Sequence, residues 1–250
     1  MGKQKLLLLP GLDGTGQLFE PLLNALQNET KIEAQVIRYP VNETKTYQEL
    51  IDFAGDIVQQ HRSVNIIAES FSGPIGLKLF EKYPDRIKGL VLVASFITPP
   101  RKIWLKLMKF LPIESLLKID IPNFLIRRYC LGDSASSELI LQFKSALKSV
   151  SPKVIAHRLS ELLKLDKEQF SQINSNKIDY IKALDDKLVP RSCTDELLRV
   201  ISAELIVVKG PHFLLQTKPE ECVEIIIKSS NSKQVLGGAP NLDKLPTSYG

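Results

Sequence analysis

Ser70 is the residue whose setting points most clearly to chemistry. It lies in the sequence AESFSG at 68–73, between an apolar run over 64–68 and a helical pattern over 73–83. A serine on a tight strand-to-helix turn is exposed for nucleophilic attack, and the residues two before and two after it must be small. Both positions hold small residues here, alanine and serine. A plain turn with incidental serines is the alternative, and the flanking strand and helix favour a nucleophile.

A serine nucleophile needs a base, and the chain has only three histidines. His61 ends a surface helix pattern, and His157 lies in a helical stretch without small residues around it. His212 directly follows an apolar run over 204–209, and sites form at the carboxyl ends of strands in α/β sheets. A lone histidine is more often structural than catalytic, but this position favours His212 as the base.

The acid that orients the base should follow the preceding strand. Asp185 and Asp186 both follow the apolar run over 178–183. The order along the chain is then Ser, Asp, His, which is typical of one arrangement of this triad. A buried carboxylate would hold the imidazole tautomer and stabilise the imidazolium. Spacing leaves both aspartates open, and either of them is also suited to capping a helix or to the surface.

Acyl transfer also needs two backbone N–H groups directed at the developing oxyanion. We expect one from Phe71, the residue after the nucleophile, at the start of a helix whose dipole favours negative charge. We expect the other from Leu12, in the loop PGLDGTG over 10–16. This loop lacks the Gly-Lys-Ser/Thr ending of a phosphate loop and the spacing of a dinucleotide-binding turn, so a flexible turn is the alternative.

The elements that must position these residues alternate along the chain. Apolar strand patterns alternate with helical patterns, which predicts an α/β fold with a mostly parallel sheet covered by helices on both faces. The expected strands lie at 5–9, 32–38, 64–68, 89–94, 178–183 and 204–209, and the expected helices at 18–26, 46–60, 73–83, 195–201 and 217–228. Capping boxes at 46–49 and 217–220 are predicted to open two of the helices.

The alternation is interrupted over 97–171, where helical stretches are broken at Pro112, Pro122, Gly132 and Pro152. We therefore expect a core formed by 1–96 and 172–228, with 97–171 inserted as a helical cap after the strand that follows the nucleophile helix. Residues 229–250 are rich in Ser, Asn, Gly and Pro, which predicts a flexible tail.

Four segments together resemble the α/β-hydrolase superfamily over roughly 5–228: LPGLDG at 9–14, AESFSG at 68–73, DKLVP at 186–190 and GPHF at 210–213. In that superfamily the acid usually stands three residues before the Val of a Val-Pro pair, which implies Asp186 rather than Asp185. The resemblance also implies a Ser-His-Asp esterase mechanism that requires no metal or organic cofactor.

More narrowly, the short insertion and the stretch over 151–166 resemble the carboxylesterases that cleave the pimeloyl carrier-protein methyl ester in biotin synthesis. The sequence departs from the family pattern at two places. Pro10-Gly11 stands where His-Gly is common, and alanine and serine replace the two elbow glycines.

The first cap helix has three possible roles. The segment RKIWLKLMKFL at 101–111 is amphipathic, with lysines on one face and apolar residues on the other. It packs on the core with a solvated basic face, or it lines an acyl pocket, or it docks on an anionic membrane surface or an acidic carrier protein with Arg127 and Arg128 contributing. The candidate pocket residues are Trp104, Met108, Phe110 and Phe213.

Composition and charge narrow the classes of function that the chain could have. The net charge is +5, but residues 97–171 alone carry 13 Lys and Arg against 7 Asp and Glu, so the basic character is local and no nucleic-acid motif accompanies it. Three widely spaced cysteines, no metal-ligand spacing and no signal-peptide pattern lead us to expect a cytoplasmic protein. The expected function is hydrolysis of a carboxylic ester or thioester of a small to medium acyl substrate, with an acyltransferase or a non-catalytic ligand-binding protein as alternatives.

Overall fold

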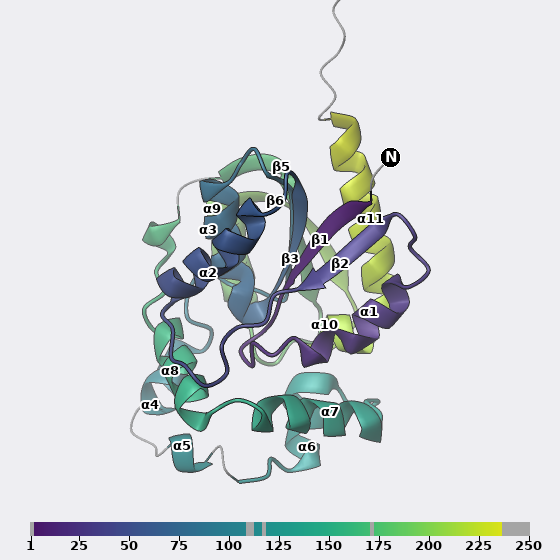
Figure 1. The fold of residues 1–250 in the computed structure, drawn as a ribbon. Coiled ribbons are helices and arrows are strands. Elements are labelled where there is room, and N and C mark those ends of the chain that lie inside the picture. The colour runs from purple at the N-terminus through teal and green to yellow at the C-terminus, as the bar shows by residue number, and fades with distance from the viewer. Residues whose placement is uncertain (1–2, 109–112, 117–118, 171–172, 237–250) are drawn as a thin grey trace, which may run out of the picture.

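The core is a single sheet of six parallel strands (Figure 1). This computed structural model describes residues 3–108, 113–116, 119–170 and 173–236. The strand order is β2-β1-β3-β4-β5-β6, and the predicted α/β fold is confirmed. The strands are β1 (Gln4–Leu9), β2 (Ile32–Val36), β3 (Val64–Glu69), β4 (Ile87–Val93), β5 (Ile173–Ala183) and β6 (Ile201–Val208).

Helices bury both faces of the sheet, because successive side chains of a strand point to opposite sides. In β1, Leu7 and Leu9 join one apolar cluster and Leu6 and Leu8 join the other. The first cluster is covered by α2 (Tyr47–Gln59), α3 (Gly73–Lys82) and α9 (Arg191–Val200), and the second by α1 (Glu20–Leu26), α10 (Leu214–Thr217) and α11 (Pro219–Leu236). Figure 1 shows these two helical layers on opposite sides of the sheet.

Between β4 and β5 the chain forms the predicted group of helices. They are α4 (Lys102–Met108), α5 (Ile113–Leu116), α6 (Asn123–Ile126), a π-helix at Arg127–Leu131, α7 (Ser137–Lys148) and α8 (Pro152–Leu162). This cap lies below the sheet in Figure 1, with α7 next to the start of α1. Its apolar cluster includes Ile126, Ile140 and Phe143 and takes in Leu18 and Phe213 from the core. None of the described helices is both long enough and apolar enough to cross a membrane.

The boundaries differ from the prediction at the C-terminal half. β5 begins at Ile173 instead of 178, and its first residues pair with β6. The sequence did not predict this extension, because Asn and Ser have low strand propensity. The last helix continues to Leu236, past its predicted end at 228, and a flexible tail stays a prediction. Extending an existing helix costs little, and a polar sequence with modest propensity can therefore stay helical. Residues 237–250 lie outside the described residues.

The two predicted capping boxes have different outcomes. At the start of α2, the Glu49 N–H donates to the Thr46 hydroxyl and the Thr46 N–H donates to the Glu49 carboxylate, as predicted. Thr217 behaves otherwise: its hydroxyl donates to the carbonyl of Phe213, 2.8 Å away, within the short helix α10. The second box is absent from the described hydrogen bonds, and Pro219 opens α11 instead.

Candidate active site

Ser70 stands at the turn between β3 and α3. Its φ is 48°, in the left-handed region that L-residues rarely occupy. The surrounding structure holds this conformation, because the Ser95 hydroxyl at the end of β4 donates to the Ser70 carbonyl over 2.8 Å. A strained backbone fixed in this way aims the Ser70 side chain outward from the carboxyl edge of the sheet, as the sequence pattern predicted.

The two residues that replace the usual elbow glycines are accommodated by their neighbours. Ala68 faces Gly76 on α3, where an added Cβ would lie 2.8 Å from the Ala68 Cβ. Ser72 is fully buried, and its hydroxyl donates to the Pro10 carbonyl while lying 2.7 Å from the Tyr39 hydroxyl. The departure at Ser72 therefore adds a hydrogen bond between the elbow and the loop that carries Leu12.

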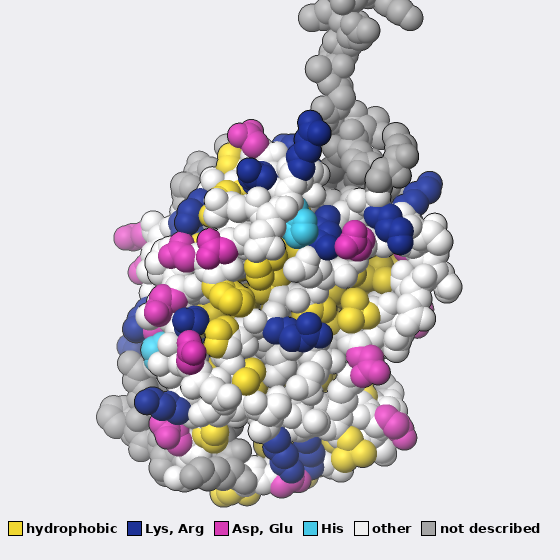
Figure 2. Space-filling view, viewed as in Figure 1, with side chains coloured by type: hydrophobic (Ala, Val, Ile, Leu, Met, Phe, Trp, Pro, Cys, Tyr) yellow, Lys and Arg dark blue, Asp and Glu magenta, His cyan; other side chains and the backbone are white. Residues whose placement is uncertain are grey.

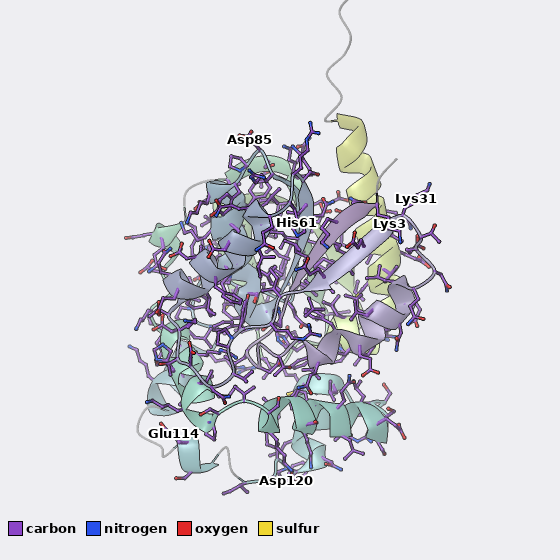
Figure 3. The ribbon with its side chains drawn as sticks, in the orientation of Figure 1. Lys3, Lys31, His61, Asp85, Glu114 and Asp120 are labelled. Carbon is purple, nitrogen blue, oxygen red and sulfur yellow. The ribbon has the colours of Figure 1, made fainter. Side chains whose placement is uncertain are left out.

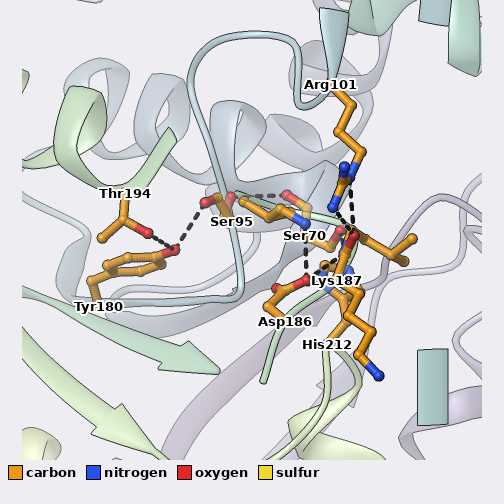
Figure 4. A network of polar contacts seen from close by, with 10 residues as sticks. Ser70, Ser95, Arg101, Tyr180, Asp186, Lys187, Thr194 and His212 are labelled. Carbon is orange, nitrogen blue, oxygen red and sulfur yellow. Dashed lines mark hydrogen bonds and ion pairs between the residues drawn. The ribbon is translucent and has the colours of Figure 1, made fainter. Parts of the chain in front are cut away.

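The structure brings Ser70, Asp186 and His212 into one hydrogen-bonded row (Figure 4). The His212 Nε2 lies 2.9 Å from the Ser70 Oγ, and its Nδ1 lies 2.7 Å from the Asp186 Oδ2. The three residues follow β3, β5 and β6, which end at the same edge because the sheet is parallel. Residues more than a hundred positions apart in the chain thus meet within hydrogen-bonding distance.

Asp186, and not Asp185, contacts the histidine. The Asp186 side chain is only 6% exposed, and its Oδ1 accepts the N–H groups of Leu188 and Val189, each over 2.8 Å. These two bonds hold the carboxylate and leave Oδ2 for His212. Asp185 is exposed, and its backbone N–H pairs with the Gly210 carbonyl. The backbone geometry of this turn separates two residues that spacing alone left equivalent.

The charges around His212 favour its protonated form. Burial lowers the pKa of His212, but the charge and hydrogen bond of Asp186 and the nearby Glu69 raise it more, so that the pKa lies above its usual 6.5. Glu69 precedes the nucleophile and is itself buried, which raises its pKa to about 7. Sequence reasoning missed Glu69, because its proximity to His212 arises only where β3 and the loop after β6 meet.

The two expected oxyanion donors, Phe71 and Leu12, lie in the turn after β3 and in the loop after β1. Phe71 is in the first turn of a short 3₁₀ helix, where backbone N–H groups have no partner within the helix. Leu12 lies in the loop after β1, in which the Gly14 N–H donates to the Gly11 carbonyl over 3.1 Å. Among the described hydrogen bonds, none has the N–H of Leu12 or Phe71 as its donor.

In the described contacts, neither of the remaining histidines touches Ser70 or Asp186. Figure 3 places His61 at the amino end of the sheet with Lys3, Lys31 and Asp85, opposite the cap residues Glu114 and Asp120. His157 is on α8, 3.9 Å from the Glu161 carboxylate. Sequence position had favoured His212, which contacts both Ser70 and Asp186, and its role as the base stays a prediction.

Of the four candidate pocket residues, only Phe213 has a described side chain. Its ring lies edge-on to the His212 ring, 5.2 Å between centroids, and edge-on to Phe143 of the cap at 5.3 Å. Phe213 therefore sits where the base meets the cap. Trp104 and Met108 lie on α4 at positions whose side chains fall outside the description, and Phe110 lies outside the described residues.

The basic character of the cap is partly neutralised within the cap. Lys144 and Lys148 on α7 both pair with Asp120, at 2.5 and 3.1 Å. Arg127 donates to two backbone carbonyls near the start of α7. In the space-filling view the cap surface shows acidic side chains beside basic ones (Figure 2). An anionic partner for this surface stays a prediction.

The sheet, its two helical layers and the cap give the chain the α/β-hydrolase fold. Two solved structures resemble it over nearly their whole length. The esterase EaEST from Exiguobacterium antarcticum has a TM-score of 0.75 at 16% sequence identity, over 92% of this chain and 93% of its own. The enol-lactonase from Burkholderia xenovorans LB400 has a TM-score of 0.74 at 12% identity, over 92% of each chain.

In sequence, the chain is similar to "Putative carbamate hydrolase RutD" of Enterobacter cloacae subsp. cloacae, with 26% identity over 238 residues and 88% of each chain covered. No family model matches the chain. The similar proteins are thus named as an esterase, a lactonase and a hydrolase. The predicted resemblance to the α/β-hydrolase superfamily is confirmed at the level of the fold.

Proposed function

We propose that the protein is a serine hydrolase that cleaves a carboxylic ester or thioester of a small to medium acyl substrate. The observation that carries this proposal is the continuous row from Asp186 through His212 to Ser70, with distances of 2.7 and 2.9 Å. The row lies at the carboxyl edge of an α/β-hydrolase sheet, and similar proteins are named as hydrolases. Both the geometry and the comparisons support acyl transfer to Ser70.

In the proposed mechanism, His212 Nε2 removes the proton from Ser70 Oγ as that oxygen attacks the ester carbonyl. The N–H groups of Leu12 and Phe71 stabilise the tetrahedral oxyanion, and the imidazolium then gives its proton to the leaving alcohol or thiol. Water, deprotonated by the same histidine, attacks the acyl-enzyme; the acyl–Oγ bond breaks, the imidazolium returns the proton to Ser70 Oγ, and the acid is released. Asp186 orients the imidazole through its Nδ1 and stabilises the imidazolium.

A fluorophosphonate probe tests the proposed nucleophile directly. We expect the wild type to be labelled at one site, and peptide mapping to place the label on Ser70. The Ser70→Ala variant should not be labelled, whereas Ser63→Ala, which changes an exposed serine just before β3, should be labelled as the wild type is. A folded wild type that resists the probe would contradict the proposal and favour a ligand-binding protein.

The pH dependence of kcat/KM should report the pKa of His212. Only the neutral imidazole can accept the serine proton, so activity should rise with pH and level off above this pKa. Because the pKa of His212 is raised, we expect the midpoint of the acid limb above 6.5. Glu69→Gln removes one of the groups that raise it and should move the midpoint to lower pH. A wild-type midpoint below 6.5 would argue against this electrostatic account.

A further inference from the structure

Arg158 is a cap residue whose charged group is buried against loops of the core. It lies on α8 and is 2% exposed. Its Nη1 donates to the carbonyls of Leu12, over 2.9 Å, and Asp13, over 2.6 Å, and its Nη2 donates to the carbonyl of Pro40 over 2.9 Å. None of the described ion pairs includes Arg158. Burying a guanidinium is costly, and these three carbonyls offset that cost.

Two of the three carbonyls that Arg158 binds, those of Leu12 and Asp13, belong to the loop expected to stabilise the oxyanion, and the third, that of Pro40, lies in the segment after β2. A carbonyl fixes the plane of its whole peptide unit, because that unit is planar. Arg158 fixes the peptide units after Leu12 and after Asp13, and the Gly14 N–H fixes the unit between Gly11 and Leu12 by binding the Gly11 carbonyl. The Leu12 N–H belongs to that last unit, and the Gly14 N–H that fixes it belongs to the Asp13 unit that Arg158 holds. The direction of the Leu12 N–H therefore depends on both contacts.

Gly14 lets the arginine approach this closely. Its φ is +70°, and an added Cβ would lie 2.5 Å from the Arg158 Nη1. The other end of the loop is held by the Ser72 hydroxyl, which donates to the Pro10 carbonyl. The loop is therefore attached to the nucleophile turn at one end and to the cap at the other.

One turn further along α8, Glu161 makes a second buried attachment. It is 3% exposed, and its carboxylate accepts the N–H of Tyr47 at the start of α2 over 3.1 Å. Two charged side chains on one face of α8 thus reach into two separate core loops. This arrangement seats α8 firmly on the core, next to the proposed oxyanion donor.

We propose that Arg158 is a positioning residue that directs the Leu12 N–H at the oxyanion, and that it thereby makes activity depend on the seating of cap helix α8. This inference rests on the proposed function. The arginine touches no reacting atom in this arrangement. Its effect reaches the transition state through the loop, where a misdirected donor loses most of its value.

Arg158→Lys and Arg158→Met test the inference. Lysine keeps the charge, but its compact ammonium cannot span the three carbonyls as a guanidinium does. We expect kcat to fall about tenfold in the lysine variant and about a hundredfold in the methionine variant, because losing one oxyanion donor outright costs about 10²–10³. KM should stay within about twofold, since the substrate ground state gains little from the oxyanion donors. Lys153→Met, an exposed cation on the same helix, should match the wild type.

A boronic acid inhibitor separates positioning from general stability. It forms a tetrahedral adduct with the nucleophile, so its affinity should fall in parallel with kcat, and both variants should keep a cooperative thermal transition. Folded variants whose kcat and boronate affinity stay within twofold of the wild type would overturn the inference. Failure of both variants to fold would also overturn it, because Arg158 would then serve stability alone. A wild type that neither hydrolyses esters nor binds the boronate would instead overturn the proposed function.

Discussion

Replacing His212 with alanine is expected to lower kcat for ester hydrolysis about 10⁶-fold. Only the loss of the Ser70 hydroxyl should have an equally large effect. His212 is the only group within hydrogen-bonding distance of the Ser70 Oγ among the described contacts, at 2.9 Å. Without it the serine hydroxyl stays protonated and attacks poorly, and the leaving group receives no proton. Steady-state hydrolysis of p-nitrophenyl esters across a range of chain lengths measures the loss.

His61→Ala provides the matched control, because His61 lies at the opposite end of the sheet (Figure 3) and should leave kcat within about twofold of the wild type. The double variant Ser70→Ala with His212→Ala should be no worse than either single variant, since the two side chains act as one unit. If the two losses multiplied, Ser70 and His212 would act independently and the proposed mechanism would be wrong.

Asp186→Asn is expected to lower kcat about 10⁴-fold with little change in KM. The asparagine keeps the shape of the side chain, so the bonds from Leu188 and Val189 to Oδ1 can persist. The asparagine lacks the negative charge that raises the pKa of His212. Its side-chain N–H can also face Nδ1, where the proton on Nδ1 needs an acceptor. The histidine is then held in the wrong tautomer, with its protonated nitrogen toward the serine.

Asp185→Asn is the natural comparison, since the two aspartates are adjacent and the change is identical. Asp185 is exposed and contributes only its backbone N–H to the structure, so its variant should keep kcat within about twofold. Measuring both variants with one ester substrate, after checking that each folds, decides between them. Equal losses of kcat at the two positions would mean that the turn after β5 is rearranged in solution and that Asp186 does not act as the acid that orients His212.

The sequence by itself predicted the α/β fold, which the structure confirms, and it singled out Ser70 and His212 for the candidate site. Ser70 and His212 each follow an apolar run, and the ends of parallel strands gather at one edge whatever the details of packing. Strand and helix patterns depend on local periodicity, which a sequence displays directly. The capping box at Thr46 and Glu49 was equally predictable, because both partners lie within one turn.

Features that depend on contacts between distant segments were decided only by the tertiary structure. The resemblance to the α/β-hydrolases implied Asp186, but only the turn after β5 shows that the side chain of Asp186 contacts His212. The close fit of Gly76 against Ala68, and the bond from Ser72 to Pro10, explain how this turn accommodates alanine and serine at the two positions. Arg158 reaches a loop almost 150 residues earlier in the chain. Nothing in the local pattern around an arginine indicates such a partner, since its role arises only when the cap is seated on the core.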